Sequence, residues 1–298
     1  MRQREENTSR RLSLKNDYLF QRMFGEEEGK SALIGLLNAI LGREGQDAIA
    51  DVTVLGSKRL TRRLIRDKEA VLDVHCETNS HELINVEMQV RRFPHMEKRS
   101  MFYVAKLFAS SIRKGQDHSH LKKTIAINLL DHALFPYERF HSTYHLYEDV
   151  EPQYRLTDLW ELHFIEFAKF RQAAYNSKNS LHRWLKYMDE TLSDEQLKEL
   201  MEMDPLIREA EARMTELSED EETRLFYEAR EKGIRDNLSL MNEARREGLE
   251  EGIEKGMEKG IQQVAVNMLR RGMDIALVAE LTGLTVEQIK AQKLSRKP

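Results

Sequence analysis

The chain has 298 residues, of which 40% are hydrophobic and 33% charged, and its formal net charge is −4 at pH 7. No apolar run approaches the ~20 residues that a membrane span needs, and the N-terminal segment lacks the apolar core of a secretory signal. The single cysteine, Cys76, excludes an internal disulfide and a cysteine zinc site. We therefore expect a globular protein of the cytoplasm without membrane partners. Its small negative charge argues against indiscriminate coating of nucleic acid but leaves room for a local basic surface.

The N-terminal part of the chain mixes helical and strand patterns. Residues 1–11 are polar and predict a disordered arm. Apolar residues recur at spacings of three and four over residues 15–41, with a break near Gly25, and again over residues 96–114, which predicts helices. Strands are predicted for residues 51–55, 124–130, 143–147 and 159–167. Strands mixed with covering helices predict an α/β domain over residues 12–175.

A predicted hairpin between residues 71 and 90 carries the clearest chemical signal. Apolar and polar residues alternate in both strands, so the apolar set should face the core and the polar set the solvent. Residues 78–81 between the strands have turn chemistry. If the strands pair, Asp73, Glu87 and Gln89 lie on one surface.

Two carboxylates and an amide on a rigid hairpin can hold a hard divalent cation. Mg²⁺ takes oxygen ligands in an octahedral shell and keeps several waters. Asp73 and Glu87 would fix the ion and leave positions for a phosphate oxygen and an attacking water, whose pKa the ion lowers. Gln89 points the same way as Glu87 and can orient that water. An ordinary amphipathic hairpin would show the same alternation, so the spacing alone leaves the structural alternative open.

This spacing also resembles a known nuclease signature. Asp73 followed by Glu87-Met88-Gln89 is similar to the D…E-x-Q form of the PD-(D/E)xK motif. With flanking blocks at residues 14–20, 67–68 and 93–115, the chain resembles the Rpn family of recombination-promoting nucleases and transposases over roughly residues 12–260. Two departures are Leu72, where the signature has proline, and Gln89, where lysine is commoner. The glutamine is usual for this branch but removes a positive charge.

The resemblance implies a PD-(D/E)xK restriction-endonuclease-like core, a mixed sheet flanked by helices, followed by an all-helical C-terminal region. It implies a metal-dependent DNA endonuclease linked to recombination, transposition or mobile elements. Asp73, Glu87 and Gln89 would be catalytic, and Asp73, Glu87 and the backbone carbonyl of Met88 would bind Mg²⁺, for which Mn²⁺ can substitute. Second-tier site residues are Asp17, Lys68, Arg99 and Tyr103. Asp17 also suits the start of a helix, where an acid complements the helix dipole.

The most basic stretch of the N-terminal part lies just upstream of Asp73. Basic side chains beside a metal site can contact phosphates of DNA without reading sequence. The predicted nucleic-acid-binding residues are Lys58, Arg59, Arg62, Arg63 and Arg66. A charged loop over an ordinary surface would show the same composition. DNA is the predicted partner, although an RNA or damaged-strand nuclease would fit these residues as well.

The character of the chain changes near residue 176. Residues 176–217 predict a helical extension, and residues 218–263 predict a charged helix with glycines four apart at Gly248, Gly252, Gly256 and Gly260. On a helix these glycines form one ridge beside an aliphatic ridge. Because each glycine costs a helix about 1 kcal/mol relative to alanine, we expect compensating contact with another copy, as a homodimer or higher oligomer. A flexible, partly helical linker is the alternative.

Residues 264–298 predict a small helix-turn-helix-like cap. An apolar helix, a turn at Gly283 and Thr285 as N-cap of the next helix carry this prediction. The second helix has few long polar groups suited to base edges, so we expect a helical cap or a weak DNA contact rather than a sequence reader. A second hypothesis from a different class is a non-catalytic DNA-binding or assembly protein that self-associates through its C-terminal helices.

Overall fold

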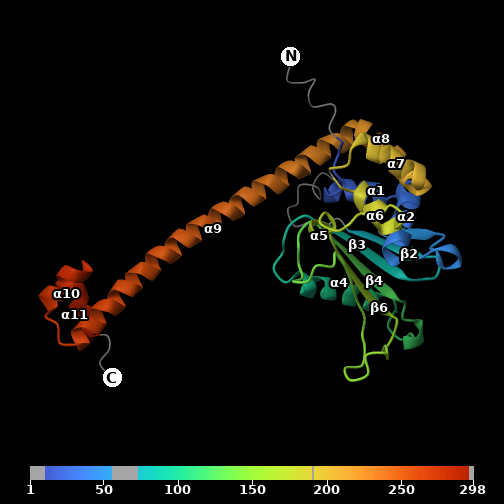
Figure 1. The fold of residues 1–298 in the computed structure, drawn as a ribbon. Coiled ribbons are helices and arrows are strands. Elements are labelled where there is room, and N and C mark those ends of the chain that lie inside the picture. Colours follow the sequence, from blue (N-terminus) through green and yellow to red (C-terminus); the bar gives the residue numbers. More distant parts are fainter. Residues whose placement is uncertain (1–10, 56–72, 190, 295–298) are drawn as a thin grey trace, which may run out of the picture. The chain divides into compact units, whose positions relative to one another are not determined.

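The structure is a computed structural model that describes residues 11–55, 73–189 and 191–294. The chain divides into two compact units, Met1–Gly233 and Ile234–Pro298, which are described separately. A six-stranded sheet with helices on both faces forms the centre of the first unit (Figure 1). In the described part of the chain, no helix combines the length and apolarity that crossing a membrane requires.

The sheet is mixed, with strand order β1-β2-β3-β4-β6-β5. Its strands are β1 (Val52–Leu55), β2 (Val74–Thr78), β3 (Leu83–Gln89), β4 (Thr124–Leu130), β5 (His141–Tyr144) and β6 (Trp160–Glu166). β3, β4 and β6 run parallel, and the other neighbours are antiparallel. The predicted hairpin forms β2 and β3. The strand predicted at residues 143–147 lies at 141–144 instead, because pairing with β6 ends at Tyr144.

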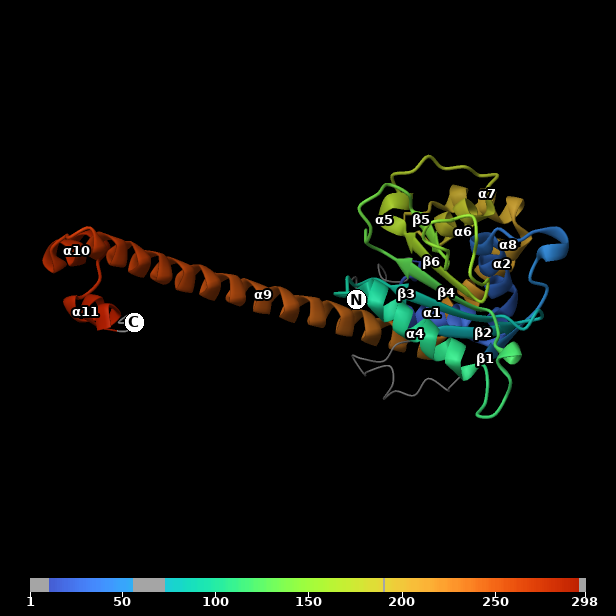
Figure 2. The same cartoon turned by 90° about the horizontal axis from the view of Figure 1, so that it is seen from below.

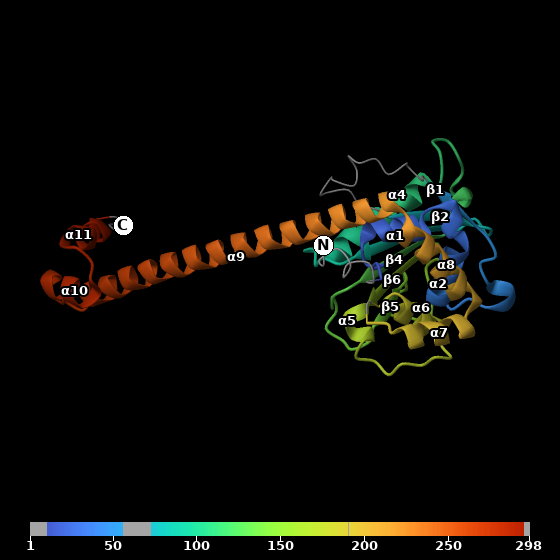
Figure 3. The same cartoon turned by 90° about the horizontal axis from the view of Figure 1, so that it is seen from above.

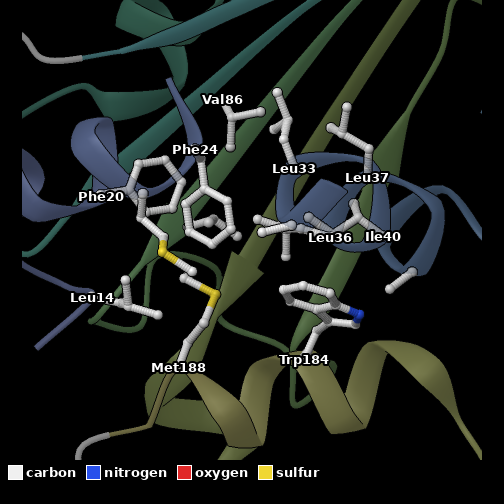
Figure 4. Close-up of a cluster of buried hydrophobic side chains, with 14 of the residues drawn as sticks. Leu14, Phe20, Phe24, Leu33, Leu36, Leu37, Ile40, Val86, Trp184 and Met188 are labelled. Carbon is white, nitrogen blue, oxygen red and sulfur yellow. The ribbon is translucent and has the colours of Figure 1, made fainter. Parts of the chain in front are cut away.

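One face of the sheet is covered by helices from both ends of the first unit (Figures 1 and 3). They are α1 (Asp17–Phe24), α2 (Lys30–Leu41), α6 (Ser180–Tyr187), α7 (Asp194–Met203) and α8 (Pro205–Glu219). Figure 4 shows Phe24, Leu36 and Trp184 packed together in this core. A Cβ on Gly35 of α2 would lie 2.4 Å from Trp184 Cζ2, so the close approach of α2 and α6 requires glycine. The predicted helical extension thus shares the core of the sheet.

The opposite face is covered by α4 (Met96–Ser110), which lies along the sheet (Figure 2). Met96 and Val104 of α4 pack on a smaller cluster formed by Ala126, Leu130, Leu162 and Phe164 of β4 and β6. α4 ends four residues before the predicted helix end, where the Ser111 N–H bonds to the Phe108 carbonyl. Short elements complete this unit: η1 (Glu27–Gly29), η2 (Gly45–Asp47), η3 (His118–His120) and α5 (Phe167–Phe170).

The second unit is helical, as predicted. Helix α9 (Glu221–Arg270) continues into it from the first unit, and α10 (Ile275–Thr282) and α11 (Val286–Leu294) follow. Ala265, Val278 and Ile289 form its small core, one residue from each helix. Gly283 adopts φ 71° in the turn, and the Thr285 hydroxyl accepts a hydrogen bond from the Gln288 N–H at 3.2 Å. The predicted helix-turn-helix is therefore present, preceded by the end of α9.

Candidate active site

The register of β2 and β3 brings two carboxyl groups together. Val74 pairs with Val86 in antiparallel register, so Asp73, one residue before β2, lies opposite Glu87. Paired residues of an antiparallel ladder point to the same face. A side-chain hydrogen bond joins the Asp73 and Glu87 carboxyls. The hairpin thus places the two acids on one face and in contact with each other.

Two amides hold the Glu87 carboxylate. Gln89 Nε2 donates to Glu87 Oε2 at 3.2 Å, and Asn85 Nδ2 donates to Glu87 Oε1 at 3.3 Å. These residues flank Glu87 at a spacing of two, which keeps all three on one face of β3. Because each carboxylate oxygen has its own donor, rotation of the carboxylate is restrained. The structure therefore brings the three predicted catalytic residues, Asp73, Glu87 and Gln89, into one hydrogen-bonded group.

The polar face of β3 is buried, which corrects the expectation that it faces solvent, whereas the His75 side chain on β2 is 45% exposed. The exposed fractions of Asn85, Glu87 and Gln89 are 5%, 1% and 7%. α4 covers this face, and Asn128 of the neighbouring strand β4 donates to the Ser100 hydroxyl of α4 at 2.9 Å. Alternation along one hairpin cannot reveal a covering helix that comes later in the chain.

Burial raises the pKa of both carboxyls. Burial, followed by the negative charge of Glu87, raises the pKa of Asp73 to about 8. Burial also raises the pKa of Glu87, against the opposing influence of the Arg99 guanidinium and the two amides. A proton or cation shared between the two carboxylates lowers the free-energy cost of holding them side by side in a buried site. The pair is therefore a site that favours a proton or a cation.

Arg99 and Tyr103, two of the second-tier residues, lie beside the pair on α4. The Arg99 guanidinium carbon is 4.9 Å from the centre of the Tyr103 ring and 5.4 Å from that of Phe93. Its positive charge acts on both Asp73 and Glu87, and its buried Nε donates no hydrogen bond to any described residue. Phe93 was not predicted as a site residue. Its position directly after the basic end of the β3 segment was the available signal.

Asp17 is engaged elsewhere. Arg230 of α9 donates from Nε to Asp17 Oδ1 at 2.8 Å, and Arg230 Nη2 forms a second ion pair with Asp17 Oδ2. Asn16, the N-cap of α1, accepts from the backbone of the first helical turn. The Asp17 charge contributes to the raised pKa of Asp73, but its carboxylate is not in the hydrogen-bonded group. Asp17 therefore acts as an ion-pair partner at the start of α1.

Several predicted residues lie outside the described part of the chain. They are Lys68 and the basic set Lys58, Arg59, Arg62, Arg63 and Arg66. Residues 1–10 of the predicted arm lie outside it as well, whereas Arg11 forms an ion pair with Glu211 of α8 at 2.7 Å.

The donors present fit a hard divalent cation. Asp73, Glu87 and the Gln89 amide all offer oxygen, which Mg²⁺ and Mn²⁺ prefer. The Asn85 side chain, which also hydrogen-bonds His75, adds a further amide oxygen beside Glu87. Among the described residues, no group of three or more His, Cys, Asp or Glu side chains is placed to hold a metal ion. Two carboxylates would therefore need amide, backbone or water oxygens to complete a coordination shell.

A second polar network, which sequence reasoning missed, links β5 to β6. His141 Nε2 lies 2.9 Å from His163 Nδ1, and His163 Nε2 lies 2.9 Å from Glu161 Oε1. Lys123 Nζ lies 2.8 Å from Glu161 Oε2. The alternation of Glu161 and His163 along β6 was the available signal. Ile165 follows on the same face as these residues and belongs to the large core, so the network lies on the face opposite α4.

A mixed sheet with an Asp–Glu pair on its hairpin defines a PD-(D/E)XK-type protein. A sequence profile for "PD-(D/E)XK nuclease family transposase" matches residues 14–244. The chain therefore belongs to this family. A second profile, for the C-terminal HTH domain of the Rpn/YhgA-like nuclease family, matches residues 258–294 and makes it an Rpn-type member. Searches of curated proteins and of solved structures found no match.

These findings confirm the predicted family and fold class. They support a nuclease, a hydrolase of nucleic acid, with a DNA-binding helix-turn-helix. PD-(D/E)XK nucleases usually use divalent metal ions, in line with the oxygen donors around Glu87. The HTH match begins inside α9, so the last turns of that helix belong to the helix-turn-helix unit.

Proposed function

We propose that this protein is a metal-dependent DNA endonuclease whose catalytic centre is the Asp73–Glu87 pair. The observation that carries the proposal is the hydrogen-bonded contact of these two buried carboxyls in a chain of a nuclease family. A purely structural role would not require two acids to face each other under a helix, because such contact destabilises the charged forms. An energetically unfavourable contact of this kind, which shifts pKa values, is typical of functional sites.

Asp73 and Glu87 would hold the cation, with the Met88 backbone carbonyl as a further ligand. Mg²⁺ is the expected ion, and Mn²⁺ can replace it. When bound, such an ion supplies charge neutralisation at the scissile phosphate and Lewis acidity.

The surrounding side chains would orient the Glu87 carboxylate and the attacking water, and would offset the negative charge of the phosphate. Asn85 and Gln89 fix the Glu87 carboxylate through its two oxygens. The Gln89 amide oxygen, whose nitrogen is used by Glu87, can accept a hydrogen bond from the attacking water. Arg99 adds positive charge where the phosphate would enter. α4 shields the pair from bulk solvent, which strengthens every electrostatic interaction inside.

Nicking of supercoiled plasmid tests this proposal. The wild-type protein should nick plasmid with Mg²⁺ or Mn²⁺ and be inactive in EDTA. Asp73→Ala and Glu87→Gln should lower the nicking rate by at least about 100-fold, the scale on which removal of a central electrostatic group acts. Glu77→Gln is the matched control, because Glu77 lies on the same strand but pairs with Lys122 at 2.6 Å. Full activity of Asp73→Ala, or binding without cleavage under all conditions, would favour the non-catalytic alternative.

Helix α9 supports a homodimer. Leu249, Ile253 and Met257 are 63%, 55% and 63% exposed. A Cβ on any of Gly248, Gly252, Gly256 and Gly260 would meet nothing within 4 Å, so this ridge is open to another backbone. Ridges formed by i,i+4 rows pack on each other in crossed helix pairs.

Charge favours an antiparallel crossing of two α9 helices. Residues 247–254 carry four acids and no base, whereas residues 255–261 carry Lys255 and Lys259 with one acid, Glu258. An antiparallel crossing near residue 254 would set the acidic segment of one copy against these two lysines of the other. Sedimentation velocity should show a dimer that Ile253→Glu dissociates, while Glu243→Gln, an exposed control, leaves it intact. A monomeric wild type would contradict this assignment.

The biological setting follows from family membership. A nuclease unit with an Rpn-type helix-turn-helix fits a role in recombination, transposition or other events at mobile elements. Cys76 is a free, buried thiol, which suits the reducing cytoplasm.

A further inference from the structure

An exposed aromatic side chain stands on α4 beside the candidate centre. Phe102 is 64% exposed and its neighbour Met101 is 44% exposed. The Phe102 ring contacts Tyr103 edge-on, with 5.5 Å between ring centres and 73° between planes. An open phenyl ring on a helix that is otherwise packed on the sheet has no evident role in folding.

A row of side chains in contact with one another leads from Phe102 to Arg99, whose charge acts on the carboxylate pair. Tyr103 lies beside it, the Arg99 guanidinium lies over the Tyr103 ring at 4.9 Å, and Phe93 lies on Arg99 at 5.4 Å. Arg99 in turn acts electrostatically on Asp73 and Glu87. The row therefore leads from the surface to the site.

The surroundings of Phe102 are basic. Lys98 and Lys106, one turn before and one turn after Phe102 on α4, are both exposed, and Glu97 is the one acid among residues 96–110 of this helix. A surface that combines a free aromatic face with cations is complementary to a nucleic-acid strand, which offers base faces and phosphates. An acidic or purely apolar protein partner would match it less well.

The connection between β5 and β6 provides a contrast. Val150, Tyr154 and Leu156 are 82%, 65% and 79% exposed there. Their neighbours Glu148, Asp149 and Glu151 make that loop acidic, so it repels phosphate. Tyr154 thus lies in an acidic loop, whereas Phe102 lies between two lysines of α4.

We propose that Phe102 stacks on an unpaired base of the DNA substrate and so sets the adjoining phosphate beside the Asp73–Glu87 pair. The proposal rests on the proposed nuclease function and names its substrate class: single-stranded or flapped DNA. A base inside a duplex has both faces covered by its neighbours, so it cannot stack on a protein ring without leaving the helix. Stacking tolerates every base, since each has a π-face.

Fluorescence of a single-stranded oligonucleotide containing 2-aminopurine tests the proposal. Binding is measured with the full-length protein in EDTA, so that no cleavage occurs. The wild type should change the 2-aminopurine emission by stacking, and Phe102→Ala should weaken single-strand binding about 5- to 100-fold and abolish the emission change. Phe102→Trp should retain both. Tyr154→Ala, the matched exposed aromatic, should behave as wild type.

Blunt duplex DNA separates stacking from general affinity. The duplex should bind wild type and Phe102→Ala equally, because phosphate contacts and the helix-turn-helix are unchanged. Equal single-strand binding by the two proteins, or an equal loss on duplex, would overturn the proposal. So would dissociation of a dimer by Phe102→Ala, which would assign the ring to a second copy. Binding is measured without cleavage, so an inactive nuclease centre would not change this result. Failure of the stacking proposal can therefore be distinguished from failure of the proposed nuclease function.

Discussion

Replacement of Asp73 by asparagine should stabilise the metal-free protein at neutral pH. The pKa of this carboxyl rises from an ordinary 3.8 to about 8 in the fold, chiefly because it is buried and next because Glu87 repels its charged form. At pH 7 the folded state therefore holds a proton that the unfolded state has released. Stability from this group is fully present below about pH 4 and is lost as the pH rises towards 8. Asparagine keeps the shape and has no proton to lose.

The magnitude follows from proton linkage. Uptake of one proton on folding lowers the free energy of unfolding by about 1.4 kcal/mol for each pH unit. From pH 5.0 to 7.5 the wild type should therefore lose about 3 kcal/mol relative to Asp73→Asn. The raised pKa of Glu87 acts in the same direction in both proteins and largely cancels in the comparison.

Urea unfolding between pH 5.0 and 8.0 in EDTA measures this difference. Asp47→Asn is the control for the loss of one negative charge, because Asp47 is exposed. Excess Mg²⁺ should recover stability in the wild type and have little effect on Asp73→Asn. Parallel pH profiles for wild type and Asp73→Asn would refute the shared-proton description of the pair.

Three further substitutions test the structure away from the pair. Burial and the neighbouring imidazole lower the pKa of His141 to about 4. The stability that this group contributes is therefore present above pH 6.5 and is lost as the pH falls. Between pH 7 and 5, the free energy of unfolding of His141→Gln, measured in urea, should fall by about 2 kcal/mol less than that of the wild type. Gly35→Ala should cost about 1–3 kcal/mol, because its Cβ would lie 2.4 Å from Trp184 Cζ2; an unchanged urea midpoint would contradict this packing. Arg230→Met should lower the free energy of unfolding by about 3 kcal/mol, because it removes the ion-pair partner of Asp17. The double mutant Arg230→Met with Asp17→Asn should recover most of that loss.

Local patterns predicted much of the sheet. Strand β4 forms at the predicted residues because a continuous apolar run is typical of a strand buried on both faces. The hairpin formed because alternation and turn residues agreed, and its register alone set Asp73 against Glu87. These features depend on residues close in sequence.

Features that join distant segments were not predictable from the pattern. The cover of α4 over Glu87 and the ion pair of Asp17 with Arg230 depend on how whole elements pack. By contrast, Arg99 and Tyr103, which lie one turn apart on α4, were among the residues named from the sequence. Charge and spacing indicated which residue types mattered, whereas tertiary packing decided which of them met.

Calorimetric titration of Mn²⁺ into the metal-free protein is the most direct test of the central claim. The wild type should bind one or two ions with release of protons, because a cation replaces the proton held between Asp73 and Glu87. Asp73→Asn and Glu87→Gln should each weaken this binding at least tenfold, and Glu77→Gln should not. Binding that is equal in all four proteins would show that the ion is held elsewhere and would contradict the account.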